Sequence, residues 1–278
     1  MEDVPEVLAK AMRTLDSANN KTLRCAGYYI MHVSDKFSVV VLNTVLYSTR
    51  HKPAYPADQQ GDPMGQFAWL RAVLGRCREE KRSVWVVGHI APGYDSFEFK
   101  QMWSEQYTAS YIDIISAHHD VVKGQLYGHE HLNTYRLFEE DTNIEAPIIL
   151  SGSVSPIFGN APSFRVIEYD KETFEILDVV SYGTGRIDEA EGGKHWKERF
   201  RFNDVFKTRS LSSASLRDLT ERLGNDEKLM RVYHFRKADT DTAPWPKTGT
   251  VLPFPGDKHE LCAMKHLQET PFGRCLGA

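Results

Sequence analysis

Two short apolar segments of this chain end in the same way, with a glycine followed by a histidine. The first is Val86-Val87-Gly88-His89, and the second is Leu126-Tyr127-Gly128-His129, which continues into Glu130-His131. Near-continuous apolar runs are typical of strands that are covered on both faces of a sheet, and binding residues gather where such strands end. The pattern therefore predicts a layered α/β fold with histidines at the strand ends.

The histidines in these segments are candidate metal ligands. A neutral imidazole nitrogen binds zinc and related first-row metals, and His129 and His131, one residue apart on a turn, can reach two neighbouring ions. Gly88 and Gly128 each remove a Cβ that would crowd the approach. We therefore predict that His89, His129 and His131 form half of a dinuclear site. A single Gly-His pair is more often an ordinary polar turn, so the prediction depends on the two segments occurring together.

The overall composition is that of an ordinary globular protein. Of the 278 residues, 41% are hydrophobic and 26% are charged, and the net charge is −4. This balance argues against a basic nucleic-acid-binding surface, and no apolar run approaches the roughly 18 residues of a membrane span. Residues 1–15 lack the pattern of a signal peptide and have the apolar spacing of an amphipathic helix. The sequence has neither a phosphate-binding glycine loop nor the Gly-x-Ser-x-Gly elbow of a serine hydrolase.

The predicted elements alternate between strand and helix and then change to successive strands. We expect helices at 67–81, 107–118, 215–223 and 227–235, and strands at 24–33, 37–47, 83–87, 121–127, 134–138, 147–151, 164–169 and 174–181. The loop of residues 90–104 is long, and long loops beside a candidate site are often functional. Around Gly183–Gly193 the sequence becomes rich in glycine and charge. We place a domain boundary there, with an α/β domain at 1–183 and a small, mostly helical region at 184–278.

The cysteines bear on whether the protein works in an oxidising compartment of the cell. The four are Cys25, Cys77, Cys262 and Cys275, and none has the spacing of a zinc knuckle. Cys262 and Cys275 close a short loop in a tail with little core of its own, which makes them a candidate disulfide pair. That pairing would place the protein in an oxidising compartment. The sequon Asn20-Lys21-Thr22 makes Asn20 a candidate glycosylation site.

A longer series of motifs resembles a known family. In chain order the motifs are Leu42-Asn43-Thr44, Gly65-Gln66-Phe67-x-Trp69-Leu70, Val87-Gly88-His89-Ile90-x-Pro92-Gly93 and Gln125-x-Tyr127-Gly128-His129-x-His131. This order resembles the calcineurin-like metallophosphoesterases. More narrowly, the segments Ser155-Pro156 and Phe158-Gly159-Asn160-x-Pro162-x-Phe164, and the tail with Cys262-Ala263-Met264 and Cys275, are similar to the acid sphingomyelinase-like phosphodiesterases. The resemblance covers residues 20–182 well and the tail weakly.

The resemblance implies an αββα sandwich that holds two zinc ions, on which a metal-bound hydroxide attacks phosphorus. It implies that His89 and His129 are ligands of one ion and His131 of the other. It further implies hydrolysis of a small-molecule or lipid-derived phosphodiester by a secreted or lysosomal protein. It does not identify the exact substrate, the general acid or the oligomeric state.

One part of the family's site has no assigned counterpart. The family's Asp-x-His, Gly-Asp and Gly-Asn-His motifs precede the first motif matched here, so we expect an N-terminally incomplete domain without the carboxylates of its centre. Asp62, Asp95 and Asn43 are poor substitutes on spacing alone. A sheet without its first strands would also leave strands 37–42 and 83–87 without partners, which is an aggregation hazard. Two hypotheses follow: part of a zinc-dependent phosphodiesterase, or a catalytically inactive binding or structural module of the same fold.

Overall fold

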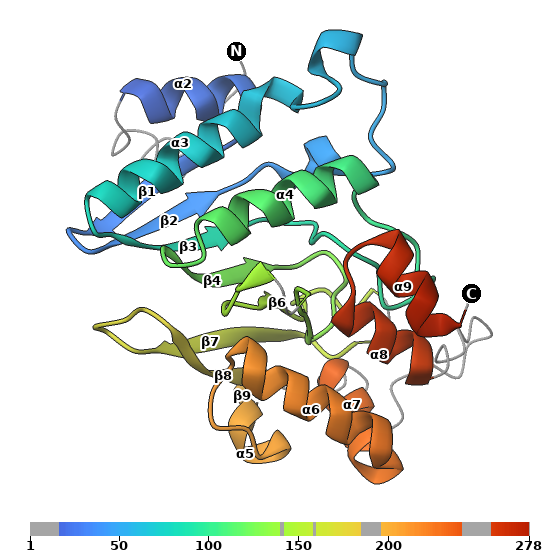
Figure 1. Cartoon of the computed structure of the whole chain (residues 1–278). Coiled ribbons are helices and arrows are strands. Elements are labelled where there is room, and N and C mark those ends of the chain that lie inside the picture. Colours follow the sequence, from blue (N-terminus) through green and yellow to red (C-terminus); the bar gives the residue numbers. More distant parts are fainter. Residues whose placement is uncertain (1–16, 140–141, 158–159, 185–195, 241–256, 278) are drawn as a thin grey trace.

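The computed structural model describes residues 17–139, 142–157, 160–184, 196–240 and 257–277. The described elements form layers, with two β-sheets enclosed between helices (Figure 1). The amphipathic helix that we predicted for residues 1–15 lies outside the described residues. None of the helices in the described part is both long and apolar enough to cross a bilayer.

The larger sheet has six strands in the order β1-β2-β3-β4-β6-β5. They are β1 (Tyr29–Ser34), β2 (Phe37–Val41), β3 (Ser83–Val87), β4 (Val122–Tyr127), β5 (Thr134–Arg136) and β6 (Ile148–Leu150). Strands β2, β3, β4 and β6 are parallel, and the antiparallel strands β1 and β5 lie at the two edges. Because β1 and β4 complete the pairing of β2 and β3, the prediction that these two strands would lack partners was wrong.

The smaller sheet is antiparallel and consists of β7 (Ser163–Tyr169), β8 (Ile176–Gly183) and β9 (Lys197–Arg201). In the turn between β7 and β8, the Asp170 carboxylate accepts hydrogen bonds from the backbone N–H groups of Glu172 and Thr173, at 2.7 and 2.8 Å. Strand β9 follows the predicted boundary and pairs with β8. The division into 1–183 and 184–278 remains a prediction, because residues 185–195 lie outside the described residues.

The helices before residue 184 are α2 (Ser17–Ala26), α3 (Gln66–Glu79) and α4 (Glu105–Ala117), with the 3-10 helices η1 (Thr44–Tyr47), η2 (Ala57–Gln59) and η3 (Pro63–Gly65). The later ones are α5 (Phe202–Phe206), α6 (Ser213–Asn225), α7 (Glu227–Lys237), α8 (Asp257–Lys265) and α9 (Glu269–Leu276). Two of these begin at N-cap side chains, Ser212 for α6 and Asp226 for α7, which accept backbone hydrogen bonds from the first turn.

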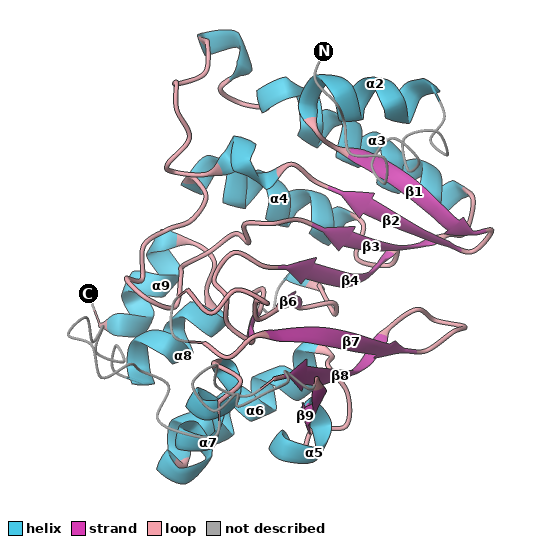
Figure 2. Cartoon of the chain, turned by 180° about the vertical axis from the view of Figure 1, so that it is seen from behind, coloured by secondary structure: helices cyan, strands magenta, loops and turns pink. Residues whose placement is uncertain are grey.

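Two apolar clusters fill the spaces between the layers. The first joins α3 and α4 to one face of the larger sheet and includes Leu70, Val86 and Ile114. The second joins the opposite face, through Trp85, to the smaller sheet and to the helices α6–α8, for example at Leu219. The resulting order of helix, sheet, sheet and helix, visible from both sides in Figures 1 and 2, confirms the predicted layered α/β sandwich.

The structure differs from the predicted strand at residues 24–33. Residues up to Ala26 belong to α2, and Gly27, with φ of +76°, ends the helix. The Gly27 N–H donates to the carbonyl oxygens of Leu23 and Thr22, at 3.0 and 3.1 Å, which is the capping pattern that a left-handed glycine provides. The strand therefore begins only at Tyr29. Similarly, the strand predicted for 37–47 ends at Val41, and the chain turns into η1.

The C-terminal tail is closed by the predicted disulfide. Cys262 of α8 and Cys275 of α9 are bonded, with their Cα atoms 5.7 Å apart, whereas Cys77 is a buried free thiol. Helix α9 packs on the long loop of residues 90–104, where the ring of Phe272 stacks on that of Tyr94 with centroids 3.7 Å apart. The candidate glycosylation residue Asn20 belongs to α2, but its side chain lies outside the described part.

Candidate metal centre

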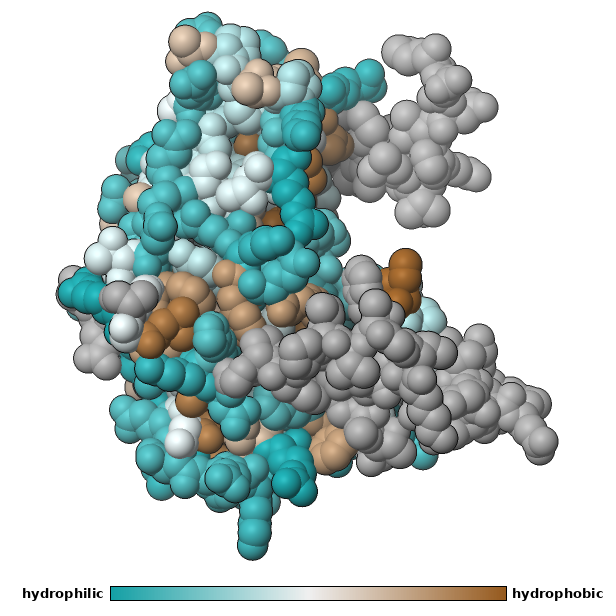
Figure 3. Space-filling view, turned by 90° about the vertical axis from the view of Figure 1, so that its right-hand side faces the viewer, coloured by the Kyte–Doolittle hydropathy of each residue, from teal (hydrophilic) through white to brown (hydrophobic). Residues whose placement is uncertain are grey.

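His89 and His129 lie next to each other at the ends of neighbouring strands. Strands β3 and β4 are parallel and adjacent, so their carboxyl ends meet at the same edge of the sheet. The Gly128 N–H donates to the His89 carbonyl oxygen at 3.0 Å, which joins the two Gly-His segments directly. As a result, His89 Nε2 and His129 Nδ1 are 3.2 Å apart. These strand ends point toward the side of the molecule shown in Figure 3, where hydrophilic residues predominate.

The distance between these two nitrogens fits two ligands of one ion. With zinc–nitrogen bonds of about 2.0–2.1 Å, two nitrogens on a tetrahedral zinc lie about 3.3 Å apart. The observed separation of 3.2 Å also suits a hydrogen bond between one protonated and one unprotonated ring nitrogen. The spacing of the pair is therefore compatible with two ligands of one metal ion.

His131 lies in the same electrostatic environment. Burial, followed by the charges of His89 and His131, lowers the pKa of His129; burial and His89 likewise lower the pKa of His131. Lower pKa values favour the neutral imidazoles that metal binding requires. Among the described residues, however, no group of three or more His, Cys, Asp or Glu side chains is arranged to hold a metal ion. The structure thus brings His89 and His129 into contact, with His131 beside them and not in one ligand group.

The two glycines have different roles. A Cβ at Gly88 would lie 2.6 Å from Thr44 Cγ2 and 2.6 Å from Tyr127 Cε1, so this position has no space for a side chain. At Gly128 the nearest atom would be His89 Nδ1, at an ordinary contact distance of 3.7 Å. Packing therefore excludes a side chain at Gly88 and permits one at Gly128, and the idea that the glycines ease the approach of a metal stays a prediction.

The carboxylates and amide considered as substitute ligands have structural roles. Asp62 caps α3 by accepting hydrogen bonds from the N–H groups of Phe67 and Ala68, at 2.7 and 2.9 Å. Asp95 accepts hydrogen bonds from three backbone N–H groups of its own loop. Asn43 donates from Nδ2 to the carbonyl oxygen of Ala26 at 2.9 Å.

An Asp-x-His sequence, Asp257-Lys258-His259, occurs late in the chain, after the histidine motifs. It begins α8, where Asp257 Oδ1 lies 3.1 Å from His234 Nε2. The ring of His259 lies against that of Phe99, with centroids 5.2 Å apart. These contacts direct both side chains to other partners, and they do not supply the missing carboxylate.

Sequence reasoning missed two residues that support the histidine turn. Thr44 Oγ1 accepts hydrogen bonds from the N–H groups of His89 and Ile90. Glu130, between the two histidines, is 4% exposed and forms an ion pair of 2.7 Å with Arg136. Burial raises the pKa of Glu130, although Arg136 opposes that effect. The only signal for Glu130 in the sequence is its place between two candidate metal ligands, His129 and His131.

A cavity of about 210 Å³ adjoins the candidate centre. Its walls come from the segment after β2, from the long loop and from the histidine turn. The lining residues are Val45, Ser48, Thr49, Arg50, His51, Ile90, Met102 and His129. This cavity opens on the predicted metal ligand His129, and it is large enough for a small organic group.

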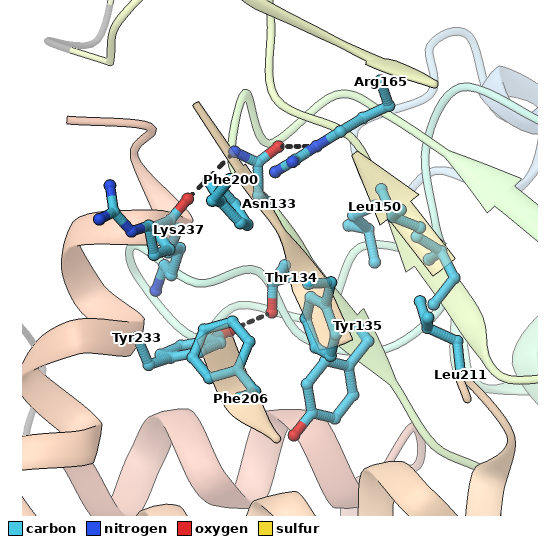
Figure 4. Close-up of a pocket in the computed structure, with 14 residues that line it drawn as sticks. Asn133, Thr134, Tyr135, Leu150, Arg165, Phe200, Phe206, Leu211, Tyr233 and Lys237 are labelled. Atoms are coloured by element: carbon cyan, nitrogen blue, oxygen red, sulfur yellow. Dashed lines mark hydrogen bonds between the residues drawn. The ribbon is translucent and has the colours of Figure 1, made fainter. Parts of the chain in front are cut away.

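Figure 4 shows a separate cavity of about 20 Å³ whose lining includes none of the three histidines. It lies where Thr134 and Tyr135 of β5 face Tyr233 of α7. At its edge, Arg165 Nε donates to Asn133 Oδ1 at 2.8 Å. A space of this size has room for about one water molecule, so it is not a substrate site.

The aromatic residues of the long loop are packing residues. Trp103 is fully buried, and its ring lies against those of Tyr47 and Tyr111. Tyr94 is stacked on α9. These rings therefore anchor the loop to the domain and do not line the cavity beside His129.

Comparison with known proteins shows similarity to phosphodiesterases. The chain is 28% identical over 281 residues to a sphingomyelinase phosphodiesterase C of Dictyostelium discoideum, which covers 94% of this chain and 60% of that protein. It is 27% identical over 252 residues to the acid sphingomyelinase-like phosphodiesterase 3b of Homo sapiens, which covers 86% and 53%. It is 24% identical over 276 residues to a cyclic GMP-AMP phosphodiesterase of Homo sapiens, which covers 94% and 59%. The chain thus spans 53–60% of the length of these curated relatives.

No family model matches the chain. Among solved structures, a dimetal phosphatase from Danio rerio aligns with a TM-score of 0.39 and 13% identity over 62% of this chain and 66% of that chain, a likeness too distant to carry an argument. The similarity in sequence nevertheless extends well beyond the motifs that first suggested it. The predicted resemblance is therefore confirmed: over most of its length the chain is similar in sequence to sphingomyelinase and acid sphingomyelinase-like phosphodiesterases.

Proposed function

We propose that this chain provides the histidine side of a zinc-dependent phosphodiesterase centre. The observation that carries the proposal is the 3.2 Å separation of His89 Nε2 and His129 Nδ1 at the ends of adjacent parallel strands. These two residues would hold one ion, and His131 would belong to a second. When bound, zinc would polarise the phosphoryl oxygens and lower the pKa of a bound water.

The remaining side chains beside this centre suit an ester of phosphoric acid. Arg50 lies in the wall of the adjoining cavity, and a guanidinium is well suited to phosphate oxygens. The cavity is otherwise lined in part by Val45, Ile90 and Met102, which favour an apolar or aromatic substituent. The proposed substrate is therefore a small-molecule or lipid-derived phosphodiester, a class that includes the substrates after which the relatives are named.

A second function is a catalytically inactive module of the same fold. The observation that favours it is that no third ligand side chain joins His89 and His129 within the described residues. For that reason, we derive no catalytic step from the residues of this chain. The disulfide between Cys262 and Cys275 supports a secreted or lysosomal location for either function, because disulfides persist in oxidising compartments.

The two functions are separated by measuring zinc binding and hydrolysis together. We expect the purified chain to bind zinc, and we expect His89→Ala and His129→Ala each to remove that binding. His32→Ala is the matched control, because His32 is exposed and contacts Ser38 on β1 and β2. Hydrolysis of bis(p-nitrophenyl) phosphate that stops with a chelator and returns with zinc supports the phosphodiesterase. Zinc binding without hydrolysis supports the inactive module, and no binding by the wild type overturns the proposed centre.

A further inference from the structure

We propose that the buried ion pair of Glu130 and Arg136 is a positioning device that fixes the turn carrying His129 and His131. The proposal rests on the proposed function, since it treats these histidines as metal ligands. It assigns Glu130 and Arg136 no contact with substrate or metal. Their role is to act through the backbone of the histidine turn.

The backbone of this turn is strained at both histidines. His129 has φ of +72° and His131 has φ of +58°, in the left-handed region that non-glycine residues seldom adopt. In addition, the Glu130 N–H donates to the Gly128 carbonyl oxygen at 2.9 Å. This hydrogen bond closes a three-residue turn in which His129 is the central residue. A three-residue turn with positive φ at its centre is rare and strained. Such a conformation persists only where the surrounding structure determines it.

Glu130 connects the histidine turn to the structure around it. One carboxylate oxygen, Oε2, accepts a hydrogen bond from the Ser96 N–H at 2.9 Å, and the other, Oε1, accepts one from Arg136 Nη2 at 2.7 Å. The first contact ties the turn to the long loop, and the second ties it to β5. With both oxygens engaged and only 4% of the residue exposed, the side chain between the two strained histidines is fixed.

Arg136 is itself held by fixed partners. It is fully buried and also donates to the carbonyl oxygens of Tyr94 and Tyr135 and to the hydroxyl of Thr134. A guanidinium whose donors are used in this way cannot follow a moving carboxylate. Arg136 therefore fixes the position of Glu130, and Glu130 in turn holds the turn in which His129 lies 3.2 Å from His89.

A second buried ion pair provides a matched control. Lys237 Nζ and Glu260 Oε2 are 2.6 Å apart, and the two residues are 3% and 1% exposed. This pair joins α7 to α8 and, within the described residues, makes no hydrogen bond to the histidine turn. Its charges act on Glu130 and Arg136, so Glu260→Gln alters the electrostatics near the turn while leaving the hydrogen bonds of Glu130 in place. Loss of either pair is expected to destabilise the fold, but only the first is expected to alter the histidines.

The test compares Glu130→Gln with Glu260→Gln at a temperature where both variants are folded. Glu130→Gln is expected to weaken zinc affinity about 10–100-fold, the range seen when a group that orients a ligand is changed. It is also expected to shift the imidazole nitrogen resonances of His89 and His129 in the metal-free protein. Glu260→Gln is expected to lower the melting temperature without either effect.

The outcomes separate this proposal from the proposed function. If the wild type binds no zinc, the proposed function fails, while the metal-free resonances still decide the role of Glu130. Unchanged resonances and affinity in Glu130→Gln overturn the positioning role even if zinc binds. The same holds if Glu260→Gln changes them equally. If Glu130→Gln does not fold, Glu130→Asp gives the second measurement: it keeps the charge but is too short to reach both Ser96 and Arg136, so the same shifts are expected.

Discussion

Thr44 Oγ1 accepts the backbone N–H of His89 at 3.2 Å, and it also accepts the N–H of Ile90 at 2.8 Å. Thr44 is 1% exposed and is the first residue of η1, which begins shortly after β2 ends at Val41. The Gly88 N–H still bonds Leu126 of β4, and the Thr44 side chain satisfies the next two backbone donors after β3. This contact explains why the chain leaves β2 at Val41 and turns, where sequence alone predicted a strand to residue 47.

We expect Thr44→Val to lower the free energy of unfolding by about 1–3 kcal/mol, because it leaves two backbone donors without their acceptor. Zinc affinity should fall as well, because His89 loses its support. The control is Thr220→Val, at another buried threonine, which bonds Leu216 and Tyr135 in the second core. That variant should lose stability only. Equal zinc affinity in Thr44→Val and the wild type, by titration calorimetry, would contradict this prediction.

Two glycine substitutions should have opposite signs. Gly88→Ala is expected to destabilise the fold by about 1–3 kcal/mol, since its Cβ would overlap Thr44 and Tyr127 in a packed core. Gly75→Ala, within α3, meets no atom within 4 Å. It is expected to stabilise the protein by about 0.5–1 kcal/mol, because alanine favours a helix over glycine. Urea unfolding of the two variants measures both effects, and a stable Gly88→Ala protein would show that the strand ends can move apart.

Reduction of the Cys262–Cys275 disulfide should lower the free energy of unfolding by about 2–4 kcal/mol, given a sequence separation of 13 residues. The denaturation midpoint of the wild type should therefore fall when a reductant is added. In the double variant Cys262→Ala/Cys275→Ala the reductant should have no effect, which excludes a contribution from the free thiols of Cys25 and Cys77. A wild-type midpoint that does not respond to the reductant would count against the bond.

The Lys237–Glu260 pair should make stability depend on pH. Burial acts to raise the pKa of Glu260, but Lys237 and then Arg136 act against it, and the pKa is lowered overall. A carboxylate with a lowered pKa contributes stability above its ordinary pKa of about 4.3, and the contribution is lost as the pH falls through the folded-state value.

Glu260→Gln should therefore be less stable than the wild type at pH 7, by about 3–5 kcal/mol if Lys237 is left buried without its partner. The difference should shrink as the pH falls below about 4. Melting curves of both proteins between pH 7 and pH 3 test this expectation. A difference that stays constant across the range would mean that Glu260 does not titrate with folding.

The sequence predicted the positions of the histidines better than it predicted the residues that support them. Apolar runs and the Gly-His endings placed His89 and His129 at strand ends, and parallel pairing then required those ends to meet. In contrast, Thr44 lies 45 residues from His89 in sequence, and Ser96 lies 34 residues from Glu130. No local pattern reveals partners so distant, because they are set by tertiary packing.

Local rules also failed where two signals competed. Residues 24–33 contain enough apolar and aromatic side chains to suggest one strand, but Gly27 divides them into a helix end and a strand start. A glycine inside an apolar run is compatible with a bulge, a turn or a helix cap. The choice among them was made by α2, whose last turn leaves the carbonyl oxygens of Thr22 and Leu23 in need of a donor, which the Gly27 N–H supplies.

Tyr94 belongs to two contacts at once. Its ring stacks on Phe272 of the disulfide-closed tail, and its carbonyl oxygen accepts Arg136, which in turn holds Glu130. The disulfide-closed tail is therefore joined to the histidine turn by an unbroken series of contacts, although Phe272 and Glu130 are far apart in the sequence.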